Sequence, residues 1–493
     1  MVVATERFKK FTILHSNDMH GDFLAESSGE EGHLIGGMSL LSGYINQVRQ
    51  EEKNVLFVIS GDMVQGSMID TEYKGLSTIE IMNYLAPDVV TLGNHELDYG
   101  FPHLLLLEKM ANFPIVNANL YIKKYNKRLM NPYVILNVDG FDIMFIGITT
   151  EEVLKSLKLD ASIGTFISLE DAAGEVGKIC NAYKNDDIDL TVVLTHIGFE
   201  EDKKLAALLD PEWGVDMIIG GHSHTFLEQP AEVNNILIAQ AGVGTDQIGR
   251  FDIVVDDDTN SIVEWTWELL PVDSNLAEPD ADLEKLIDSF KEQVDRKYNR
   301  LVGRLARKLV HPVRERETEL GNLVADIFDE LEMTDVVLVG SASIRGTELG
   351  PLVTLRDLKE VYPYNDAIYR VKVTGSQLKH IFSSIMRPEN RVPDEGFYFQ
   401  VNQGVKAVYS DAKNQLESLE VNGEAVEDDV QYNLCLQEFF FKNSTETLNI
   451  TTEELTKLGN EKVLATAAQD VLEEYFSSHQ NINSHVEGRL IQK

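Results

Sequence analysis

Five apolar runs in the first half of the chain each end in a cluster of polar residues. Their length and their content of valine, isoleucine and phenylalanine are typical of buried strands. Their endings concentrate aspartate, asparagine and histidine where a strand end would usually scatter polar side chains. The five segments are FTILHSNDMHGD, VLFVISGDMVQGS, VVTLGNHELDYG, LTVVLTHIGFEED and VDMIIGGHSHT, which begin at residues 11, 55, 89, 190 and 215.

Segments with helical periodicity lie between these strands, among them LSTIEIMNYL at residues 76–85 and SLEDAAGEVGKICNAY at residues 168–183. Strands that alternate with helices predict an α/β fold. Ligand sites in α/β sheets lie just past the carboxyl ends of strands, so we expect the five polar endings to meet in one crevice.

The pattern changes toward residue 300. A predicted hairpin at residues 251–270 precedes an amphipathic helix at residues 280–300, with acidic residues at its start and basic ones at its end. Its apolar face consists of Leu283, Leu286, Ile287, Phe290, Val294 and Tyr298. Beyond it we expect helices at 318–331 and 464–476 and strands at 335–345 and 367–375. The predicted domains are therefore 8–272, an interdomain helix or linker at 273–300, and a mixed α/β domain at 301–493.

Length and composition agree with this division. A chain of 493 residues is too long for one ordinary core, and 43% apolar with 25% charged residues is typical of a soluble globular protein. The net charge of −38 argues against a nucleic-acid polymer as partner and leaves a small molecule or a metal, although an acidic surface can also serve solubility alone.

No stretch reaches the roughly 18 apolar residues of a membrane helix, and MVVATERFKKFTILHSND lacks an apolar region before a cleavage site. We therefore expect a cytoplasmic protein with no membrane partner. The two cysteines, Cys180 and Cys435, fit no metal or redox spacing and are interpreted as small buried hydrophobic residues.

The polar strand ends have the chemistry of a metal site. Carboxylates, imidazoles and one carboxamide, without cysteine, suit manganese, zinc, iron or cobalt. Seven candidate ligands are too many for one ion, so two ions could share Asp62 as a bridge. The other ligands would then be Asp18, His20 and His224 for one ion and Asn94, His196 and His222 for the other. Two such ions favour in-line attack on phosphorus, since they lower the pKa of a bridging water and neutralise phosphoryl oxygens.

The set NDMHG, SGDMVQGS, LGNHELDYG, THIG and GGHSHT resembles the calcineurin-like metallophosphoesterases. The order, the spacing and the following domain resemble specifically the 5′-nucleotidase family, which includes UDP-sugar hydrolases and 2′,3′-cyclic-nucleotide phosphodiesterases. The resemblance covers roughly residues 10–490. It implies an N-terminal αββα two-sheet metal domain, a linking helix and a C-terminal mixed α/β domain that binds the nucleoside part of the substrate. It also implies the ligand division given above.

By the same resemblance, His95 is the catalytic histidine and Asp98 orients it. As an imidazolium, His95 could stabilise the departing oxygen or the phosphoryl charge, and Asp98 is close enough to hold its ring. Asp98 could instead cap the following helix. The stretch PIVNANL, with Asn117 and Asn119, also matches a region near the family's site, although a strand-end turn explains it equally well.

The C-terminal domain matches the family only in part. Arg314 in RERETELGNL and Arg345 in SIRG match the arginines that bind phosphate and ribose, and Arg316 could exchange roles with Arg314. The family's Asn-Gly-Gly-Gly is here Gly-Ser-Ala-Ser, at residues 340–343. The late Gly-Gly-Asp that binds ribose hydroxyls is absent from EFFFKNSTET.

Two aromatic residues match the family's base-stacking pair, Tyr364 in VYPYNDAIYRV and Phe439 in LQEFFF. The alternative is that these aromatics belong to the core, because in a strand at least one residue of the FFF run should point inward.

These observations predict a dimetal phosphohydrolase. The expected reaction is that of a 5′-nucleotidase in nucleotide catabolism, in which a metal-bridging hydroxide attacks a nucleoside monophosphate in line. A 2′,3′-cyclic-nucleotide phosphodiesterase and a nucleotide-sugar or dinucleotide pyrophosphohydrolase are alternatives within the enzymes. A metal- or nucleotide-binding protein without turnover is the alternative of another class, and the complete set of ligands and the His95–Asp98 pair favour the enzyme.

Overall fold

The computed structural model describes residues 7–27, 32–122, 124–150, 165–392 and 397–493. Residues 1–6, which begin the N-terminal stretch considered above, lie outside the described residues. The chain divides into two compact units, Met1–Val294 and Asp295–Lys493. The division falls inside helix α8 (Ala281–Tyr298), at the position of the predicted interdomain helix. The domain ranges 8–272, 273–300 and 301–493 stay predictions.

A six-stranded sheet carries the first three of the five motif strands. Strands β1, β4, β5 and β6 run parallel, β16 pairs antiparallel with β1, and β17 pairs antiparallel with β16. The order is β17 (Ser261–Pro271), β16 (Gln247–Asp256), β1 (Phe8–Ser16), β4 (Val55–Ser60), β5 (Val89–Thr91) and β6 (Ile115–Val116). The pair β16–β17 is the hairpin predicted at residues 251–270.

A second six-stranded sheet carries the other two motif strands. Strands β10, β12, β13 and β15 run parallel, and β9 and β14 pair antiparallel at the two edges. The order is β14 (Ala231–Val233), β15 (Ile236–Ala239), β13 (Met217–Ile219), β12 (Leu190–His196), β10 (Phe141–Thr149) and β9 (Tyr133–Val138). The motif strands therefore belong to two sheets.

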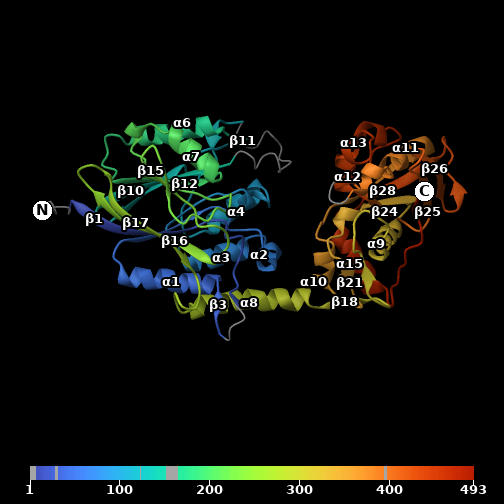
Figure 1. Ribbon diagram of the computed structural model, residues 1–493, viewed down its shortest axis with the longest axis horizontal. Coiled ribbons are helices and arrows are strands. Elements are labelled where there is room, and N and C mark those ends of the chain that lie inside the picture. The colour runs from blue at the N-terminus through green and yellow to red at the C-terminus, as the bar shows by residue number, and fades with distance from the viewer. Residues whose placement is uncertain (1–6, 28–31, 123, 151–164, 393–396) are drawn as a thin grey trace. The chain divides into compact units, whose positions relative to one another are not determined.

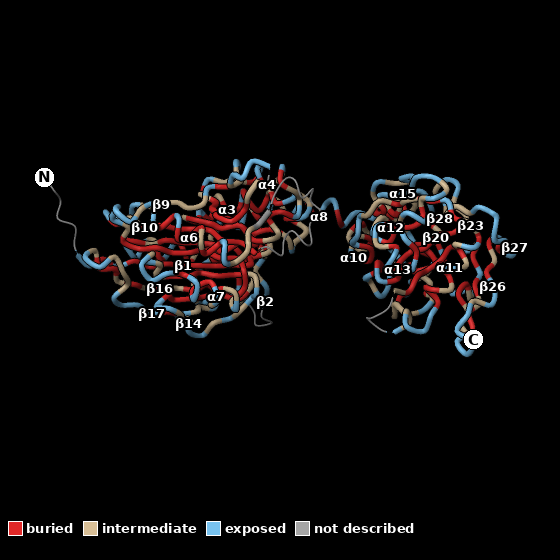
Figure 2. Tube along the Cα trace, turned by 90° about the horizontal axis from the view of Figure 1, so that it is seen from above, coloured by how far each residue is buried: buried red, intermediate tan, exposed pale blue. Residues whose placement is uncertain are grey.

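The two sheets pack face to face, with helices outside them. One core joins Ile13 and Val58 of the first sheet to Phe145 and Val192 of the second. In Figure 1, α6 (Leu169–Ala182) and α7 (Phe199–Leu208) lie on the side of the second sheet, while α1 (Met38–Glu51) and α3 (Leu76–Leu85) lie on the opposite side. The strands between these helices are buried, as the red tube of Figure 2 shows for β1 and β10. This is the αββα architecture that the resemblance implied.

Among the described residues, this unit also contains helices α2 (Met68–Tyr73) and α4 (Phe101–Met110). Helices α3 and α6 confirm the helical segments predicted from periodicity, and the Ser168 side chain caps α6 by accepting from the backbone N–H of Asp171. In α8, the predicted apolar face is buried at Leu283, Ile287, Val294 and Tyr298.

The second unit is a mixed α/β domain. Its five-stranded sheet has the order β24 (Phe399–Val401), β20 (Val336–Gly340), β28 (Gln431–Gln437), β23 (Ile368–Thr374) and β29 (Lys462–Ala465). Its four-stranded sheet has the order β27 (Glu424–Ala425), β26 (Gln415–Val421), β25 (Val405–Ser410) and β30 (Leu490–Gln492). The helices include α9 (Glu319–Asp329), α10 (Leu355–Val361), α11 (Gly375–Ile385) and α15 (Ala468–Ser478). One apolar core contains residues of both sheets and of α11.

One expectation for this unit is wrong. The FFF run was expected in a strand, but β28 ends at Gln437 and the three phenylalanines lie in the short helix α12 (Glu438–Lys442). The helical turn buries Phe440 and Phe441 and leaves Phe439 exposed, so the alternation of a strand does not apply.

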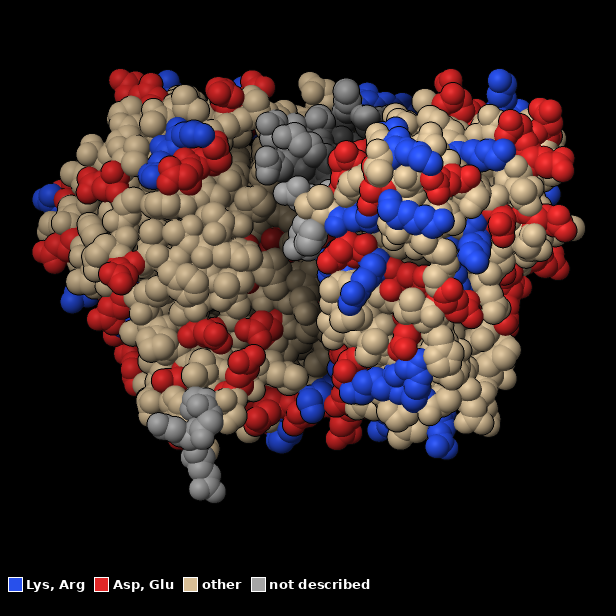
Figure 3. Space-filling view, turned by 45° about the vertical axis from the view of Figure 1, so that its right-hand side comes forward, with Lys and Arg blue, Asp and Glu red and all other residues tan. Residues whose placement is uncertain are grey.

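Three simpler expectations concern the surface, the membrane and the cysteines. The face seen in Figure 3 has acidic side chains spread over it, with lysines and arginines between them. Among the described residues, no helix is both long enough and apolar enough to cross a membrane. Cys180 and Cys435 are buried free thiols, as predicted.

Candidate metal centre

The carboxyl ends of five strands bring the seven predicted ligands into one place in the first unit. Asp18 and His20 follow β1, Asp62 follows β4, and Asn94 follows β5. His196 is the last residue of β12, and the turn after β13 carries His222 and His224. Because β1, β4 and β5 are parallel and in adjacent register, their endings emerge side by side.

Most of these ligands have an unusual backbone conformation. Left-handed φ angles are rare for residues other than glycine and cost roughly 1–3 kcal/mol each, so the surrounding structure must impose them. Backbone hydrogen bonds do so here: Asp18 N–H donates to Gly61 O (3.1 Å), and His20 N–H donates to Asp62 O (2.9 Å). The φ angles are 51° for Asp18, 48° for His20, 53° for Asp62, 79° for His222 and 53° for His224.

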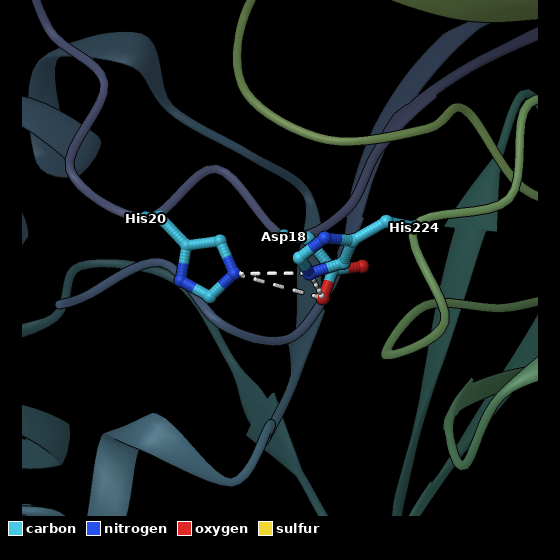
Figure 4. A group of neighbouring side chains, drawn as sticks. All are labelled: Asp18, His20 and His224. Carbon is cyan, nitrogen blue, oxygen red and sulfur yellow. Dashed lines mark hydrogen bonds and ion pairs between the residues drawn. The ribbon is translucent and has the colours of Figure 1, made fainter. Parts of the chain in front are cut away.

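The first group of ligands consists of Asp18, His20 and His224 (Figure 4). Nε2 of His20 and Nε2 of His224 are 3.3 Å apart, and they lie 3.9 and 3.3 Å from Oδ1 of Asp18. One ligand atom from each residue lies within 4.8 Å of the others. The three atoms thus face a common point.

The second group is centred on Asn94. Its Oδ1 lies 3.2 Å from His196 Nε2 and 2.9 Å from His222 Nδ1. Asp62 lies between the groups, because its Oδ2 is 3.1 Å from His196 Nε2 and 4.0 Å from His20 Nε2. The structure therefore brings all seven predicted side chains together, and Asp62 lies within 4.0 Å of a histidine of each group.

Outer contacts orient the imidazoles. His196 donates from Nδ1 to the carbonyl of Ser60 (2.8 Å), and His20 donates from Nδ1 to the carbonyl of Gln65 (3.1 Å). In the neutral rings, Nε2 is then left as a lone-pair donor toward the centre, the arrangement usual for metal-binding histidines.

The glycines of the motifs make room for the ligands. A Cβ on Gly93 would lie 2.1 Å from Oδ1 of Asp62, and one on Gly221 would lie 3.0 Å from Oδ2 of Asp18. A side chain at Gly93 would therefore displace a carboxylate of the centre.

The charges of the centre call for a cation. Asp18 and Asp62 are 0% and 2% exposed, and burial of carboxylates without positive charge is costly. Burial would raise the pKa of Asp62, but the neighbouring His196 holds it well below its usual range. Burial by itself would lower the pKa of His196, but the charges of Asp62 and Asp18 outweigh burial and raise that pKa to about 9. Without metal, a protonated imidazole thus neutralises the buried acids, and the nitrogen and oxygen donors fit divalent ions that would replace that proton.

Glu96 is a residue of this centre that the motifs alone did not single out. Its buried carboxylate accepts from three backbone N–H groups: Met63 (2.7 Å), Gly93 (2.6 Å) and Asp62 (3.1 Å). It therefore joins the turn that carries Asp62 to the turn that carries Asn94. The only signal in the sequence is a carboxylate inside the motif LGNHELD.

His95 lies beside the seven residues, next to Asp98. Its Nδ1 is 2.7 Å from Oδ2 of Asp98. This hydrogen bond and the charge of Asp62 raise the pKa of His95 to about 9, although burial lowers it. The ring centroid is 5.3 Å from that of His20. Asp98 does not cap α4, because Gly100 occupies that position. One ring nitrogen of His95 also lies close enough to His20 and Asp62 to bind a metal with them, so its position suits either a proton donor or a metal ligand.

Asn117 and Asn119 have structural contacts. Both are buried, and their side-chain amides donate to the hydroxyl and the carbonyl of Thr149 (2.8 and 2.6 Å). These contacts fit a strand-end turn, and Asn119 also lines a cavity together with His222.

In the second unit, the structure pairs two of the four predicted substrate residues. Arg345 Nε donates to the hydroxyl of Tyr364 (2.9 Å), its Nη2 donates to the same oxygen, and its guanidinium lies 5.4 Å from the ring centroid. Tyr364 is 38% exposed and Phe439 is 47% exposed, so neither aromatic belongs to the core. The guanidinium groups of Arg314 and Arg345 form no ion pair with any residue that the structure describes, in a chain with 81 acidic residues.

The turn that replaces the family's Asn-Gly-Gly-Gly is part of a buried hydrogen-bond network. Ser341 and Ser343 are buried, and Gln437 accepts from the backbone N–H of Gly340 (3.1 Å) and pairs with the Ser343 hydroxyl. These serines therefore support the segment that leads to Arg345.

Comparison with known proteins assigns both halves of the chain. The Calcineurin-like phosphoesterase family model matches residues 11–226, and the 5′-nucleotidase, C-terminal domain model matches residues 301–451. A 5′-nucleotidase of Mus musculus is 28% identical over 538 residues, which cover 98% of this chain and 90% of the mouse protein. Endonuclease YhcR of Bacillus subtilis (strain 168) is 28% identical over 414 residues, which cover 78% of this chain but 33% of that protein.

The Trifunctional nucleotide phosphoesterase protein YfkN of the same Bacillus is 29% identical over 75% of this chain and 27% of its own length. This chain thus spans about a third or less of the length of these two Bacillus relatives. Among solved structures, the 5′-nucleotidase precursor from Thermus thermophilus shares the fold with a TM-score of 0.61 at 22% identity, over 98% of this chain and 99% of that one. The Haemophilus influenzae NAD nucleotidase shares it with a TM-score of 0.58 at 20% identity, over 99% of each chain.

The αββα layers, the polar strand ends and the first family match define a calcineurin-like metallophosphoesterase domain. With the second match, the chain belongs to the 5′-nucleotidase family.

Proposed function

We propose that this protein is a dimetal phosphohydrolase that acts as a 5′-nucleotidase, converting a nucleoside monophosphate to a nucleoside and phosphate. Asp18, His20 and His224 would hold one divalent ion, Asn94, His196 and His222 the other, and Asp62 would bind both. The two ions, when bound, would supply Lewis acidity toward the phosphoryl oxygens and acidify a water molecule. Manganese, zinc, cobalt and iron all suit these ligands.

One observation carries the proposal: seven nitrogen and oxygen donors from two sheets converge, and two of them are fully buried carboxylates that need positive charge. An ordinary polar loop does not require Asp18 and Asp62 to be buried together beside four imidazoles. The second family match supports a nucleotide as substrate.

His95 would act on the leaving-group side of the reaction. Its Nδ1 is held by Asp98, so Nε2 is the atom that would donate a proton to the departing oxygen or a hydrogen bond to the phosphoryl group. Asp98 would keep the ring oriented and in the protonated form, since its hydrogen bond raises the pKa of His95.

The second unit would bind the organic part of the substrate. Arg314 and Arg345 have guanidinium groups without carboxylate partners among the described residues, which suits an anionic ligand. Tyr364 and Phe439 are exposed aromatics, which suits stacking on a base.

The segment EFFFKNSTET favours a second candidate, a phosphodiesterase or pyrophosphohydrolase acting on cyclic nucleotides, nucleotide sugars or dinucleotides. Where the family has Gly-Gly-Asp, this chain has helix α13 (Ser444–Thr447), with Ser444 and Thr447 buried. Ribose hydroxyls would therefore lack their usual aspartate partner.

A substrate panel tests the proposal. Chelator-treated protein should be inactive, and manganese, cobalt or zinc should restore hydrolysis, with close to two ions per chain by metal analysis. Nucleoside monophosphates should then be hydrolysed with a higher kcat/KM than p-nitrophenyl phosphate, cyclic nucleotides or dinucleotides. Full activity after complete metal removal would refute the dimetal site, and preference for a diester or pyrophosphate would select the second candidate.

A further inference from the structure

Two segments of the second unit carry the arginines proposed to bind substrate, and buried polar side chains hold these segments together. Residues 314–318 form the loop before α9, and residues 341–345 follow β20 through the short helix η3 (Ser341–Ser343). The guanidinium groups of Arg314 and Arg316 form no ion pair with a described residue. Their placement therefore depends on how the backbone of the loop is fixed.

Gln400, in β24, contacts both segments. Its Nε2 donates to the carbonyl of Arg316 (2.9 Å) and to the hydroxyl of Ser341 (3.0 Å), and its Oε1 accepts from the backbone N–H of Thr318 (3.2 Å). The side chain is 1% exposed. A Cβ on Gly321 would lie 2.4 Å from Cδ of Gln400. The first turn of α9 therefore leaves space for the Gln400 carboxamide only because residue 321 is glycine.

His311 makes a second connection between the same segments. The carbonyl of Ser341 accepts from Nε2 (3.2 Å), so Nδ1 is the unprotonated nitrogen that accepts from the Thr318 hydroxyl (2.7 Å). The Thr318 oxygen in turn accepts from the backbone N–H of Gly321 at the start of α9 (3.0 Å). The ring is 3% exposed, and burial lowers its pKa to about 4, which agrees with a neutral ring.

We propose that Gln400 and His311 are positioning residues that set the location of the Arg314 and Arg345 guanidinium groups for an anionic substrate. Neither touches the substrate. Both fix the loop 314–318 against the turn 341–345, so that two guanidinium groups without carboxylate partners among the described residues are presented at a defined separation. The inference rests on the proposed function, in which these arginines bind the substrate.

Asn402 provides a matched control. It lies just after β24, is 1% exposed, and uses its side-chain amide in the same way as Gln400 does, accepting from Val337 N–H (2.9 Å) and donating to Asp335 O (3.4 Å). It contacts the beginning of β20 and neither arginine segment. A general loss of stability should therefore affect Asn402 and Gln400 variants alike.

The experiment compares Gln400→Met and Asn402→Leu, which keep side-chain volume, in the metal-loaded 493-residue chain. Gln400→Met should raise the KM for the preferred nucleoside monophosphate about tenfold, the effect of weakening one or two charge-assisted hydrogen bonds, with kcat within about twofold. Asn402→Leu should leave that KM unchanged. If Gln400→Met does not fold, His311→Leu takes its place in the same comparison.

Equal effects of the Gln400 and Asn402 variants, or none from Gln400→Met, would overturn the proposal. If the wild-type protein hydrolyses other phosphate esters but no nucleotide, the proposed function fails. The positioning role is then decided by the same comparison on the ester with the highest kcat/KM in the panel.

Discussion

Nδ1 of His95 lies 2.7 Å from Oδ2 of Asp98, and the backbone N–H of His95 donates to Oδ1 of Asp62 (2.9 Å). One residue thus contacts both the carboxylate that orients its ring and the carboxylate proposed to join two metal ions. Its ring position is therefore coupled to the assembly of the metal centre.

We expect His95→Ala to lower kcat about 10²- to 10⁴-fold, the contribution of one positioned proton donor, with both metals retained. Asp98→Asn should lower kcat less, since the ring remains but loses its charged partner. Steady-state kinetics together with metal analysis check this. Loss of metal from His95→Ala would mean that His95 is a ligand, as its position near His20 and Asp62 permits.

Asp62→Asn should reduce metal occupancy below two ions per chain and abolish turnover, because a bridging ligand loses its charge. The measurement is metal content after dialysis, with Asp171→Asn, an exposed residue in the first turn of α6, as the control. Two tightly bound ions in Asp62→Asn would assign the bridge to another residue.

Glu96→Gln should destabilise the first unit by about 1–3 kcal/mol, because an amide group in place of one carboxylate oxygen faces a backbone N–H donor. It should also weaken metal binding, since the turns carrying Asp62 and Asn94 are no longer joined. All three tryptophans, Trp213, Trp265 and Trp267, lie in the first unit, so tryptophan fluorescence during urea unfolding reports on it. Glu80→Gln, on the exposed side of α3, should change neither property.

The buried carboxyl of Asp202 should make the stability of the first unit depend on pH. Burial, opposed by hydrogen bonds from Thr195 and Gln240, raises its pKa to about 7, well above the value of about 3.9 for an unfolded chain. The folded state then binds a proton that the unfolded state has lost, so this contribution to stability is full below pH 4 and is lost as the pH rises toward 7.

The variant Asp202→Asn removes that dependence. The unfolding free energy of Asp202→Asn, relative to that of the wild type, should be lowest near pH 5 and should rise up to pH 8. Tryptophan fluorescence during urea unfolding measures both free energies. A difference in unfolding free energy that is constant over this range would show that Asp202 stays ionised in the folded protein.

Tyr364→Ala should raise the KM for a nucleoside monophosphate tenfold or more, since base–aromatic stacking contributes about 1–3 kcal/mol in single-strand binding proteins. The KM for p-nitrophenyl phosphate should change far less. Tyr364→Phe keeps the ring and removes only the acceptor of the Arg345 hydrogen bonds, so it separates stacking from arginine placement. Equal effects of Tyr364→Ala on both substrates, in a folded variant, would exclude a base clamp at this position.

The position of the metal centre could be predicted because its signal is local. Each of its seven residues lies at the end of an apolar strand or within five positions after it, and the endings of parallel strands meet. The apolar and polar pattern alone could not show that the five motif strands belong to two sheets. That division depends on pairings between distant segments, such as β1 with β16. That part of the fold followed from the family resemblance.

Roles that depend on hydrogen bonds across the fold left little signal in the sequence. Glu96 binds backbone groups of two turns, and Gln400 joins segments that lie 84 and 59 positions away. The FFF run was misassigned because β-propensity favours phenylalanine in strands, whereas burial of Phe440 and Phe441 beyond the end of β28 favours a helical turn.

In the proposed ligand sets, each ion takes residues from both sheets: Asp18 and His20 with His224, and Asn94 with His196 and His222. Neither layer holds a complete set by itself. Fragment complementation with a cut anywhere between residues 94 and 196 would therefore leave both sites divided between two polypeptides, which could bind metal only after reassembly. A cut beyond residue 272 would leave every proposed ligand on one fragment.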